Sequence, residues 1–467
     1  MTGITTDINT AWRELGGDPA LLSRVSTVAR RSALEARLPV GELARACVGA
    51  CALAAAELGA RRGGLAEVPG VLVDDGAVAT AFHSERHLTV DGRAPVNFAP
   101  LSRFWRTADG WVRTHANYPH HRARLLDALG VPDDVDAVEA ALARRSSAEI
   151  EEAVYAAGGL AVALRTPKEW AAHEQAVAVA ARPLVERERL DTAHARVLPP
   201  LDGSPLLPAE GLRVLDLTRV LAGPVATRTL ALLGADVLRV DPPQLPELPD
   251  QHADTGFGKR SATLDLTSDR RTFEELLAAA DVVVTGYRPG ALDRFGLSPR
   301  ALAERRPGVV VAQVSAWGAY GPWGDRRGFD SLVQVASGIA AVEGSAEQPG
   351  ALPAQALDHG TGYLLAAAVL RALTEQSYDG GSRSVRLALA RTAEWLVHGI
   401  EAGDAEDDTY DAYEVYEVYE GPGPWLAETG SALGRLRYAL PPVSFAGGPA
   451  GWARPPVPWG SQPARWV

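Results

Sequence analysis

Cysteine and lysine are scarce in this 467-residue sequence. The only cysteines are Cys47 and Cys51, and the only lysines are Lys168 and Lys259. Two cysteines cannot form a disulfide framework, and no second pair of metal ligands stands near them. Their i, i+4 spacing within an Ala-rich helical pattern favours buried small side chains over a metal site. We therefore expect a reducing compartment and predict a cytoplasmic protein.

The sequence also lacks an excess of positive charge and a long apolar run. Its formal net charge is -12 and its isoelectric point is near 5.4, so a nucleic acid or an anionic membrane would be repelled. The N-terminus shows no basic stretch followed by an apolar core, and no window reaches about 20 uninterrupted apolar residues. We predict neither a nucleic-acid partner nor a membrane span.

What is present is the composition of a folded protein with more than one domain. Hydrophobic residues make up 46% and charged residues 22% of the chain, and a single core rarely exceeds about 300 residues. The Pro- and Gly-rich segment 195–211 is the best candidate for a boundary. We predict three parts, which are 1–200, 205–400 and 401–467. The last begins with an acidic, Tyr-rich linker over 401–420 and ends in a Pro- and Gly-rich tail that lies on a surface.

The middle part alternates strands and helices. Residues 211–217 and 235–241 read as apolar strands on either side of a helix at 222–233, which is typical of a parallel α/β unit. Further strands are predicted at 262–266, 281–285, 308–314 and 384–389. The fold class predicted for 205–400 is α/β, with a doubly wound parallel sheet of the Rossmann-like kind.

The first part should contain a second, smaller α+β domain. Residues 10–62 show helical periodicity with a break at Pro39-Val40-Gly41. Residues 102–116 read as a hairpin whose turn is Ala108-Asp109-Gly110, and a helical stretch is expected from His120 to about Leu164.

A glycine turn joins the first strand of the middle part to its helix. Leu221-Ala222-Gly223-Pro224 lacks the GxGxxG spacing of a dinucleotide site, so NAD is not expected. The helix that starts there can still present backbone N–H groups to a phosphate or to a developing oxyanion.

Five segments, taken in order, resemble the class III CoA-transferases, a family that includes formyl-CoA and carnitine CoA-transferases and the related α-methylacyl-CoA racemases. The segments are GLRVLDLTRVLAGPVATRTLALLGADVLRVDPP, GKRSATLDLTS, DVVVTGYRPGALDRFGL, SAWGAYGPWGDRRGFDSLVQVASG and ALDHGTGYLLAAAVLRALTE. The resemblance implies an enzyme whose substrates are an acyl-CoA and a carboxylic acid, with no metal and no permanently bound cofactor. It also implies a homodimer, because dimers of the family interlock.

The resemblance assigns the nucleophile to Asp358. A lone aspartate at a helix start would ordinarily be a cap. In the family, the matching carboxylate attacks the thioester to give a mixed anhydride, and CoA then returns to give an aspartyl-CoA thioester. A covalent intermediate divides one difficult displacement into easier steps.

The resemblance also implies a set of residues that contact CoA. A guanidinium suits a phosphate through charge-assisted hydrogen bonds, and ligands bind beyond the carboxyl ends of parallel strands. Lys259, Arg260 and, from its position, Arg327 are weaker candidates for the phosphates. The full set is Arg219, Leu221, Ala222, Arg239, Leu264, Tyr287, Arg288, Arg294, Arg327 and Phe329.

Some positions depart from the family pattern and keep two alternatives open. Racemase members carry a histidine where this chain has Phe329 and a glutamate where it has Arg106. Abstraction of an α-proton needs a base on each face of the carbon, so these departures disfavour racemisation. His359 is expected to be structural, because adjacent helical residues point in different directions. Formyl-CoA transferase members have glutamine in place of Leu221 and a Gly-rich loop that is absent here. An acyl-CoA isomerase or racemase, or a non-catalytic CoA-binding homologue, are the alternatives.

The order of the parts differs from the family as well. Family chains begin with the CoA-binding unit, whereas here the segment that resembles the small domain precedes residue 205. The helix expected at 41–60 resembles a second, partial copy of the one at 361–375. A rearranged, or duplicated and truncated, chain explains both features.

Overall fold

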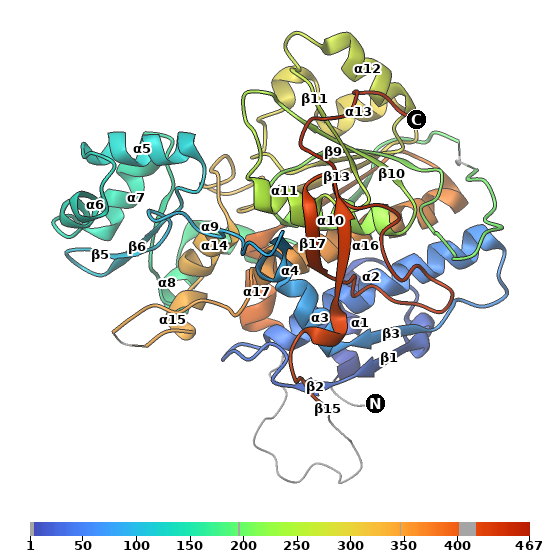
Figure 1. Cartoon of the computed structure of the whole chain (residues 1–467), viewed down its shortest axis with the longest axis horizontal. Helices are drawn as coiled ribbons and strands as arrows, with labels where there is room; N and C mark the ends of the chain where they lie inside the picture. The colour runs from blue at the N-terminus through green and yellow to red at the C-terminus, as the bar shows by residue number, and fades with distance from the viewer. Residues whose placement is uncertain (1–3, 195–196, 346, 401–416) are drawn as a thin grey trace.

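A seven-stranded sheet lies at the centre of the main body of the protein (Figure 1). The computed structural model describes residues 4–194, 197–345, 347–400 and 417–467. Six strands run parallel, and only the edge strand β8 is antiparallel to its neighbour. The spatial order is β11 (Arg260–Thr263), β10 (Asp236–Asp241), β9 (Arg213–Leu217), β12 (Val282–Thr285), β13 (Val310–Ser315), β14 (Arg383–Ala388) and β8 (Glu186–Arg189). The predicted strands are confirmed, with β11 beginning two residues earlier than expected.

Helices cover both faces of this sheet, because its strands are apolar on both sides. Val282, Val283 and Val284 are all fully buried. Val282 and Val284 belong to the core beneath α10 (Ala222–Leu232) and α16 (Ala356–Asp379). Val283 faces α12 (Arg270–Ala279) and α13 (Pro299–Arg305). The α/β class predicted from the sequence is confirmed.

Loops and short helices follow the carboxyl ends of the strands on one edge of the sheet. The remaining elements of this body are α11 (Pro249–Thr255), η2 (Asp293–Phe295), α14 (Asp330–Ala336), α15 (Ile339–Val342) and α17 (Leu389–His398). The chain between β13 and α16 carries α14 and α15, so it brings residues 316–355 over this edge.

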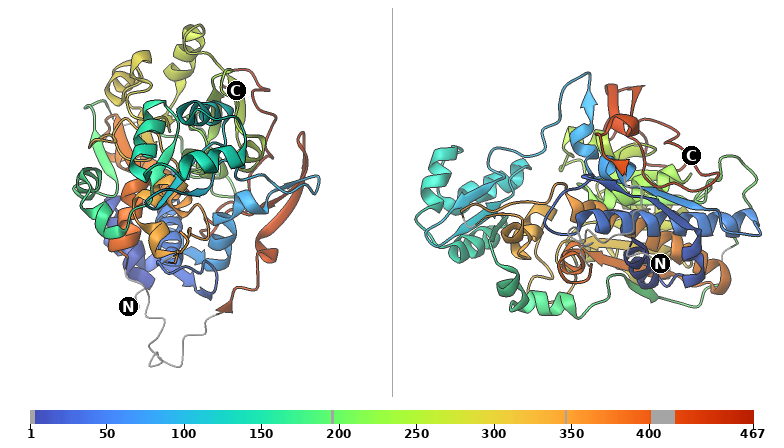
Figure 2. Two further views of the ribbon diagram at one scale, coloured as in Figure 1. Left: turned by 90° about the vertical axis from the view of Figure 1, so that its left-hand side faces the viewer. Right: turned by 90° about the horizontal axis from the view of Figure 1, so that it is seen from below.

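A smaller α+β unit stands to one side of the main body (Figures 1 and 2). Its antiparallel sheet has its own hydrophobic core against three helices. Arg106 pairs with Trp111, which confirms the predicted hairpin. The helical stretch expected up to residue 164 is wrong at its end, because residues 161–163 complete the sheet as β7. The elements are β5 (Phe104–Arg106), β6 (Trp111–Thr114), α5 (Pro119–Leu129), α6 (Val135–Leu142), α7 (Ser147–Ala156) and β7 (Ala161–Ala163), followed by α8 (Pro167–Ala171) and α9 (Glu174–Ala180).

The N-terminal segment packs against the main body through α2, which lies along α16. By length and hydropathy α2 could cross a membrane, but 94% of its apolar window is buried inside the protein. Cys47 and Cys51 are free and buried on this helix, as predicted. The segment comprises α1 (Ile4–Glu14), η1 (Pro19–Arg24), β1 (Val25–Val28), β2 (Arg30–Arg31), α2 (Val40–Gly63), β3 (Val71–Asp74), α3 (Asp75–Phe82), α4 (Ser84–His87) and β4 (Thr89–Val90).

The C-terminal residues form a hairpin and a tail that crosses the main body. The hairpin consists of β16 (Leu426–Ser431) and β17 (Gly434–Ala439), and it follows β15 (Glu417–Val418), which pairs with β2, and η3 (Gly423–Trp425). In the tail, the indole N–H of Trp459 donates to Asp241 at 3.0 Å and that of Trp466 to the Leu276 carbonyl at 2.9 Å. Most of the predicted acidic linker lies outside the described residues.

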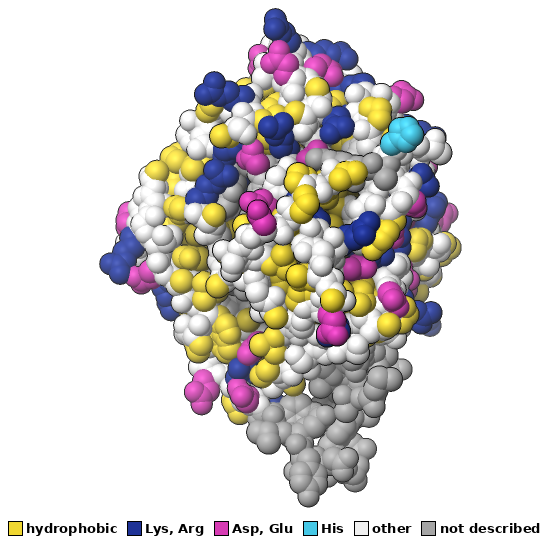
Figure 3. Space-filling view, turned by 90° about the vertical axis from the view of Figure 1, so that its right-hand side faces the viewer, with side chains coloured by type: hydrophobic (Ala, Val, Ile, Leu, Met, Phe, Trp, Pro, Cys, Tyr) yellow, Lys and Arg dark blue, Asp and Glu magenta, His cyan; other side chains and the backbone are white. Residues whose placement is uncertain are grey.

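On the face seen in Figure 3, basic and acidic side chains are interspersed.

Candidate active site

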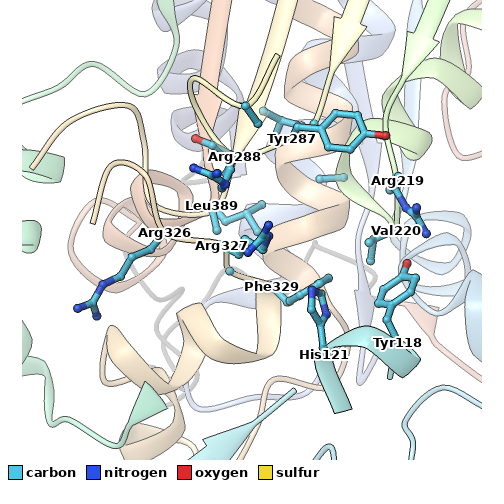
Figure 4. Close-up of a pocket in the computed structure, with 18 of the residues that line it drawn as sticks. Tyr118, His121, Arg219, Val220, Tyr287, Arg288, Arg326, Arg327, Phe329 and Leu389 are labelled. Carbon is cyan, nitrogen blue, oxygen red and sulfur yellow. The ribbon is translucent and has the colours of Figure 1, made fainter. Parts of the chain in front are cut away.

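A cavity of about 370 Å³ lies where the carboxyl edge of the central sheet meets the smaller unit. The sheet supplies the residues that follow β9, β12 and β13, and α5 supplies the opposite wall (Figure 4). The lining residues are Tyr118, His120, His121, Arg124, Arg219, Val220, Ala222, Gly223, Leu245, Gly286, Tyr287, Arg288, Ala291, Val314, Ser315, Ala316, Arg326, Arg327, Gly328, Phe329, Asp358 and Leu389.

Asp358 lies in this lining, in the first turn of α16, and only 6% of its surface is exposed. Its backbone N–H donates to the Asp330 carboxylate at 2.9 Å, so Asp330 caps the start of the helix. The backbone N–H of Ala222, the first residue of α10, donates to the Asp358 carboxyl group. Two helix N-termini therefore meet at this side chain, and their dipoles favour a negative charge there.

Burial raises the pKa of Asp358 well above its usual range, and the negative charges of Asp330 and Glu85 raise it further. Burial likewise raises the pKa of Asp330. Two buried carboxyl groups this close do not readily ionise together. Burial and mutual repulsion therefore favour the state in which this pair shares one proton.

His359, the next residue along α16, points away from the cavity. It is fully buried, its Nε2 lies 3.1 Å from Glu85 Oε2, and its ring stacks on Phe82 with centroids 5.2 Å apart. This placement agrees with the structural role expected for it.

A buried carboxylate, Glu247, organises the loop before α10. It accepts from the Val220 N–H at 3.1 Å and from Arg239 at 2.8 Å, and Tyr118 donates its hydroxyl to it from the smaller unit. Burial alone would raise the pKa of Glu247, but Arg239 and Arg219 lower it to about 2. Val220 has φ of 71°, which a β-branched residue rarely adopts. Glu247 thus holds a strained loop at the cavity wall.

Three lining arginines, Arg124, Arg288 and Arg327, belong to none of the ion pairs in the described part of the chain. Burial lowers the pKa of Arg327, and the nearby charges of Arg288 and Arg124 lower it further, so the three guanidinium groups share one space. Arg326 instead pairs with Glu152 at 2.8 Å and points away from the other labelled side chains (Figure 4). An unpaired cluster of guanidinium groups suits a phosphorylated ligand.

The structure brings seven of the predicted site residues to this cavity. Besides Asp358, they lie at the starts of α10 and α14 or directly after β9 and β12. They are Asp358, Arg219, Ala222, Tyr287, Arg288, Arg327 and Phe329.

Four predicted residues lie outside the lining. Leu221 is buried immediately before α10, and Leu264 is buried in the core beneath α12. Arg239 is fully buried and bound to Asp241 and Glu247, so it supports the wall from behind. The guanidinium of Arg294 is exposed and lies 4.7 Å from the ring centroid of Phe295.

Lys259 and Arg260, the weaker phosphate candidates, are both engaged elsewhere. Lys259 is buried and lies 3.0 Å from Asp216, while Arg260 lies 2.8 Å from Asp236. Burial lowers the pKa of Lys259 to about 8, although Asp216 opposes that change. Neither residue lines the cavity.

Among the lining residues that the sequence did not predict, one group comes from the start of α5. Tyr118, His120, His121 and Arg124 close the cavity opposite the sheet. The only sequence signal is the dense run of aromatic and basic side chains in Tyr118-Pro119-His120-His121-Arg122.

No group of three or more His, Cys, Asp or Glu that could hold a metal occurs within the part of the chain that the structure covers.

Comparisons with known proteins point to the same part of the chain. Residues 209–406 match the family described as CoA-transferase family III. The chain is 36% identical over 215 residues to the acetyl-coenzyme A transferase nodX of Hypoxylon pulicicidum, covering 44% of this chain and 36% of that protein. It is 35% identical over 194 residues to a formyl-CoA:oxalate CoA-transferase of Streptomyces coelicolor, covering 38% and 47%.

Solved structures give a weaker likeness. The crystal structure of a hypothetical protein from Mycobacterium tuberculosis is 35% identical, with a TM-score of 0.38, and the match covers 41% of this chain and 56% of that one. The chain spans about half the length, or less, of the relatives that it matches. The family match and these relatives agree that the likeness to CoA-transferase family III lies in residues 209–406 of this chain.

Proposed function

We propose that this protein transfers CoA from an acyl-CoA to a carboxylic acid, with Asp358 as the nucleophile. The observation that carries this proposal is the position of the Asp358 carboxyl group, in the cavity lining and at the meeting point of two helix N-termini. The names of the relatives, an acetyl-coenzyme A transferase and a formyl-CoA:oxalate CoA-transferase, support the same reaction class.

In the first half-reaction the acyl group passes to Asp358 and is then released as the donor carboxylate. The ionised Asp358 attacks the thioester carbonyl, the C–S bond breaks, and CoA leaves as a thiolate. The product is a mixed anhydride. The thiolate then attacks the aspartyl carbonyl of this anhydride, which releases the donor carboxylate and leaves an aspartyl-CoA thioester.

The second half-reaction runs the same steps in reverse order with a new acid. The acceptor carboxylate attacks the aspartyl thioester, which gives a second anhydride and free CoA thiolate. Attack of the thiolate on the acceptor carbonyl forms the new acyl-CoA and restores the Asp358 carboxylate. No net proton, electron or water is consumed.

Backbone N–H groups of α10 are the best candidates for stabilising the oxyanions. Leu221 has no side-chain donor, so a side-chain contribution from this position is excluded. The first-turn N–H groups of α10 have no partner within the helix, and Ala222, whose N–H donates to Asp358, and Gly223 both line the cavity. Glu247 fixes the strained residue Val220 just before this turn, which would keep the donors in place.

The CoA moiety is assigned to the arginine side of the cavity. The proposal that the six parallel strands form a doubly wound, Rossmann-like sheet is supported by their order, and in such a sheet ligands bind beyond the carboxyl ends of the strands. Arg124, Arg288 and Arg327 are unpaired there and would hold phosphate groups. The two free, buried thiols suit the cytoplasmic location that we propose.

One observation favours the alternative, an acyl-CoA isomerase or racemase. His121 lines the same cavity as Asp358, and its Nδ1 has no hydrogen-bond partner. Burial lowers the pKa of His121 to about 2, with the neighbouring His120 adding to the effect, so the imidazole is neutral but only a weak base in the free protein. The histidine that the sequence lacks at Phe329 could thus be replaced from the smaller unit.

One experiment separates these possibilities. The protein is incubated in D₂O with an acyl-CoA panel and a carboxylic acid panel, and the products are read by mass spectrometry. Transfer predicts new acyl-CoA species without deuterium at the α-carbon. Deuterium uptake without new species would establish the isomerase instead. CoA binding with neither product would leave a non-catalytic homologue.

A further inference from the structure

The N-terminal segment repeats the order of elements found around the active site. In the repeat, β1 pairs parallel to β3, α2 connects them, and α3 follows. In the main body, β13 pairs parallel to β14, α16 connects them, and α17 follows. Both connecting helices have 24 residues, and both are buried almost all round.

The helix caps and the strand registers of the two copies agree. Pro39 and Gly64 flank α2 as Gln355 and Gly380 flank α16, and β3 with α3 matches β14 with α17 two residues out of that alignment. Val28 pairs with Asp74, and Ser315 with Ala388. In both copies that last partner is the N-cap residue, directly before the next helix begins. We refer to residues 25–90 as the truncated copy.

The truncated copy lacks most of the machinery of the proposed active site. Only residues 29–39 join β1 to α2, whereas residues 316–355 join β13 to α16 and carry α14, α15 and Asp330. By the bounds of the two helices, Glu42 stands at the position of Asp358, in the first turn of α2. The truncated copy therefore keeps a carboxylate there, but it lacks Asp330, which caps that turn in the main body.

An ion pair occupies the corresponding place in the truncated copy. Asp75 aligns with Leu389, which lines the cavity in the main body. Two nitrogens of the Arg45 guanidinium donate to the Asp75 carboxylate, at 2.8 and 2.7 Å, and the side chains are only 10% and 7% exposed. A paired, buried charge of this kind leaves no room for an acyl chain at that position.

The two copies pack through their equivalent helices. A Cβ on Gly360 would lie 3.3 Å from the Cys47 sulfur, and Arg371 forms an ion pair with Glu57 further along. Both contacts join residues at almost the same height in the aligned helices, so α2 and α16 run side by side in parallel. Contact between equivalent surfaces is the arrangement of a twofold dimer interface.

The truncated copy also reaches the active site. Glu85, which follows α3, is bound to His359 at 3.1 Å, and Phe82 of α3 stacks on the same imidazole. His359 is adjacent to Asp358 in α16, so these contacts fix the first turn of the helix from behind. The charge of Glu85 is also close enough to act on Asp358.

We propose that the truncated copy is a built-in second subunit, without a site of its own, which covers α16 and positions Asp358 through Glu85. The chain then acts as a monomer with a single CoA site, in place of the homodimer expected from the sequence. This inference rests on the proposed function for what the site binds, but its statement about assembly does not.

Native mass spectrometry and sedimentation velocity of the full chain test the assembly, from about 50 nM to about 50 μM protein. We expect a monomer throughout, one CoA per chain, and a specific activity that does not change on dilution. A stable dimer, two CoA per chain, or a specific activity that falls on dilution would overturn the inference. A monomer that binds no CoA would refute the proposed function and leave the statement about assembly standing.

Glu85→Gln tests the link to the active site, with Glu67→Gln as the matched control. Glu67 lies in the same copy, but it is exposed and pairs only with Arg24. Loss of the Glu85 charge should move the pH midpoint of CoA transfer to lower pH, and the control should leave it unchanged. A Glu85 variant that unfolds more easily but keeps the original midpoint would overturn the positioning role.

Discussion

Replacing Asp330 with asparagine is the most informative perturbation of the proposed site. Asp330 accepts the backbone N–H of Asp358 at 2.9 Å, and Gln334 donates its side-chain amide to it. Asparagine keeps one acceptor oxygen of similar shape, so the start of α16 should remain capped. What it removes is the negative charge beside the nucleophile.

The size of the effect follows from the geometry. An acceptor on the N–H of Asp358 places the two carboxyl groups about 5 to 6 Å apart, where two charges at an effective dielectric constant of about 20 interact by about 3 kcal/mol. This corresponds to about two pKa units. The sign is fixed, because a neighbouring negative charge raises the pKa of Asp358 and its removal lowers it.

The assay is the initial rate of CoA transfer as a function of pH. Attack requires the ionised carboxylate, so the rate should rise with pH through the pKa of the Asp330–Asp358 pair. In Asp330→Asn this rise should occur one to two pH units lower. Ser331→Ala, which changes an uncharged neighbour, should leave it in place. A midpoint that stays unchanged or moves upward in Asp330→Asn would refute the assigned electrostatics.

Three further predictions address the ligand, the helix contact and stability. Arg327→Gln should weaken CoA binding by about 1 to 2 kcal/mol in calorimetry, because a charged hydrogen bond is lost, whereas Arg271→Gln on exposed α12 should not. Gly362→Ala should lower both the melting temperature and the activity, since its Cβ would lie 2.6 Å from a backbone oxygen of α10. In Gly360→Ala the new Cβ would lie 3.3 Å from the Cys47 sulfur, so this substitution should be tolerated. Asp358→Asn should unfold at a higher temperature than the parent at pH 8 and show no gain at pH 4. The unfolded chain releases this proton at the usual pKa of an aspartate, whereas the buried carboxyl group holds it to a higher pH, so stability falls as the pH rises between the two pKa values.

The sequence predicted the parts of the site that follow directly from the strands. Tyr287 and Arg288 come just after an apolar strand, and Ala222 starts the helix after another, so local pattern alone places them at one edge. Asp358 required the resemblance to the family, because an aspartate at a helix start is usually a cap.

Other parts depend on tertiary contacts that no local pattern reveals. Arg124 reaches the cavity only because the smaller unit folds over the sheet edge. Leu264 directly follows strand β11, but its side chain faces the core beneath α12, because successive residues of a strand point to opposite faces of the sheet. Arg239 was expected to touch the ligand, and it is instead held behind the wall by Glu247. The opposing charge of Asp330 likewise appears only when α14 and α16 are brought together.

Mapping the covalent adduct tests the central claim most directly. The protein is mixed with an acyl-CoA, quenched with hydroxylamine, digested, and sequenced by tandem mass spectrometry. The account predicts a hydroxamate on Asp358, in the peptide from the start of α16, and its absence from the Asp358→Asn variant. Turnover by the parent protein with Asp358 unmodified at every time point would contradict it.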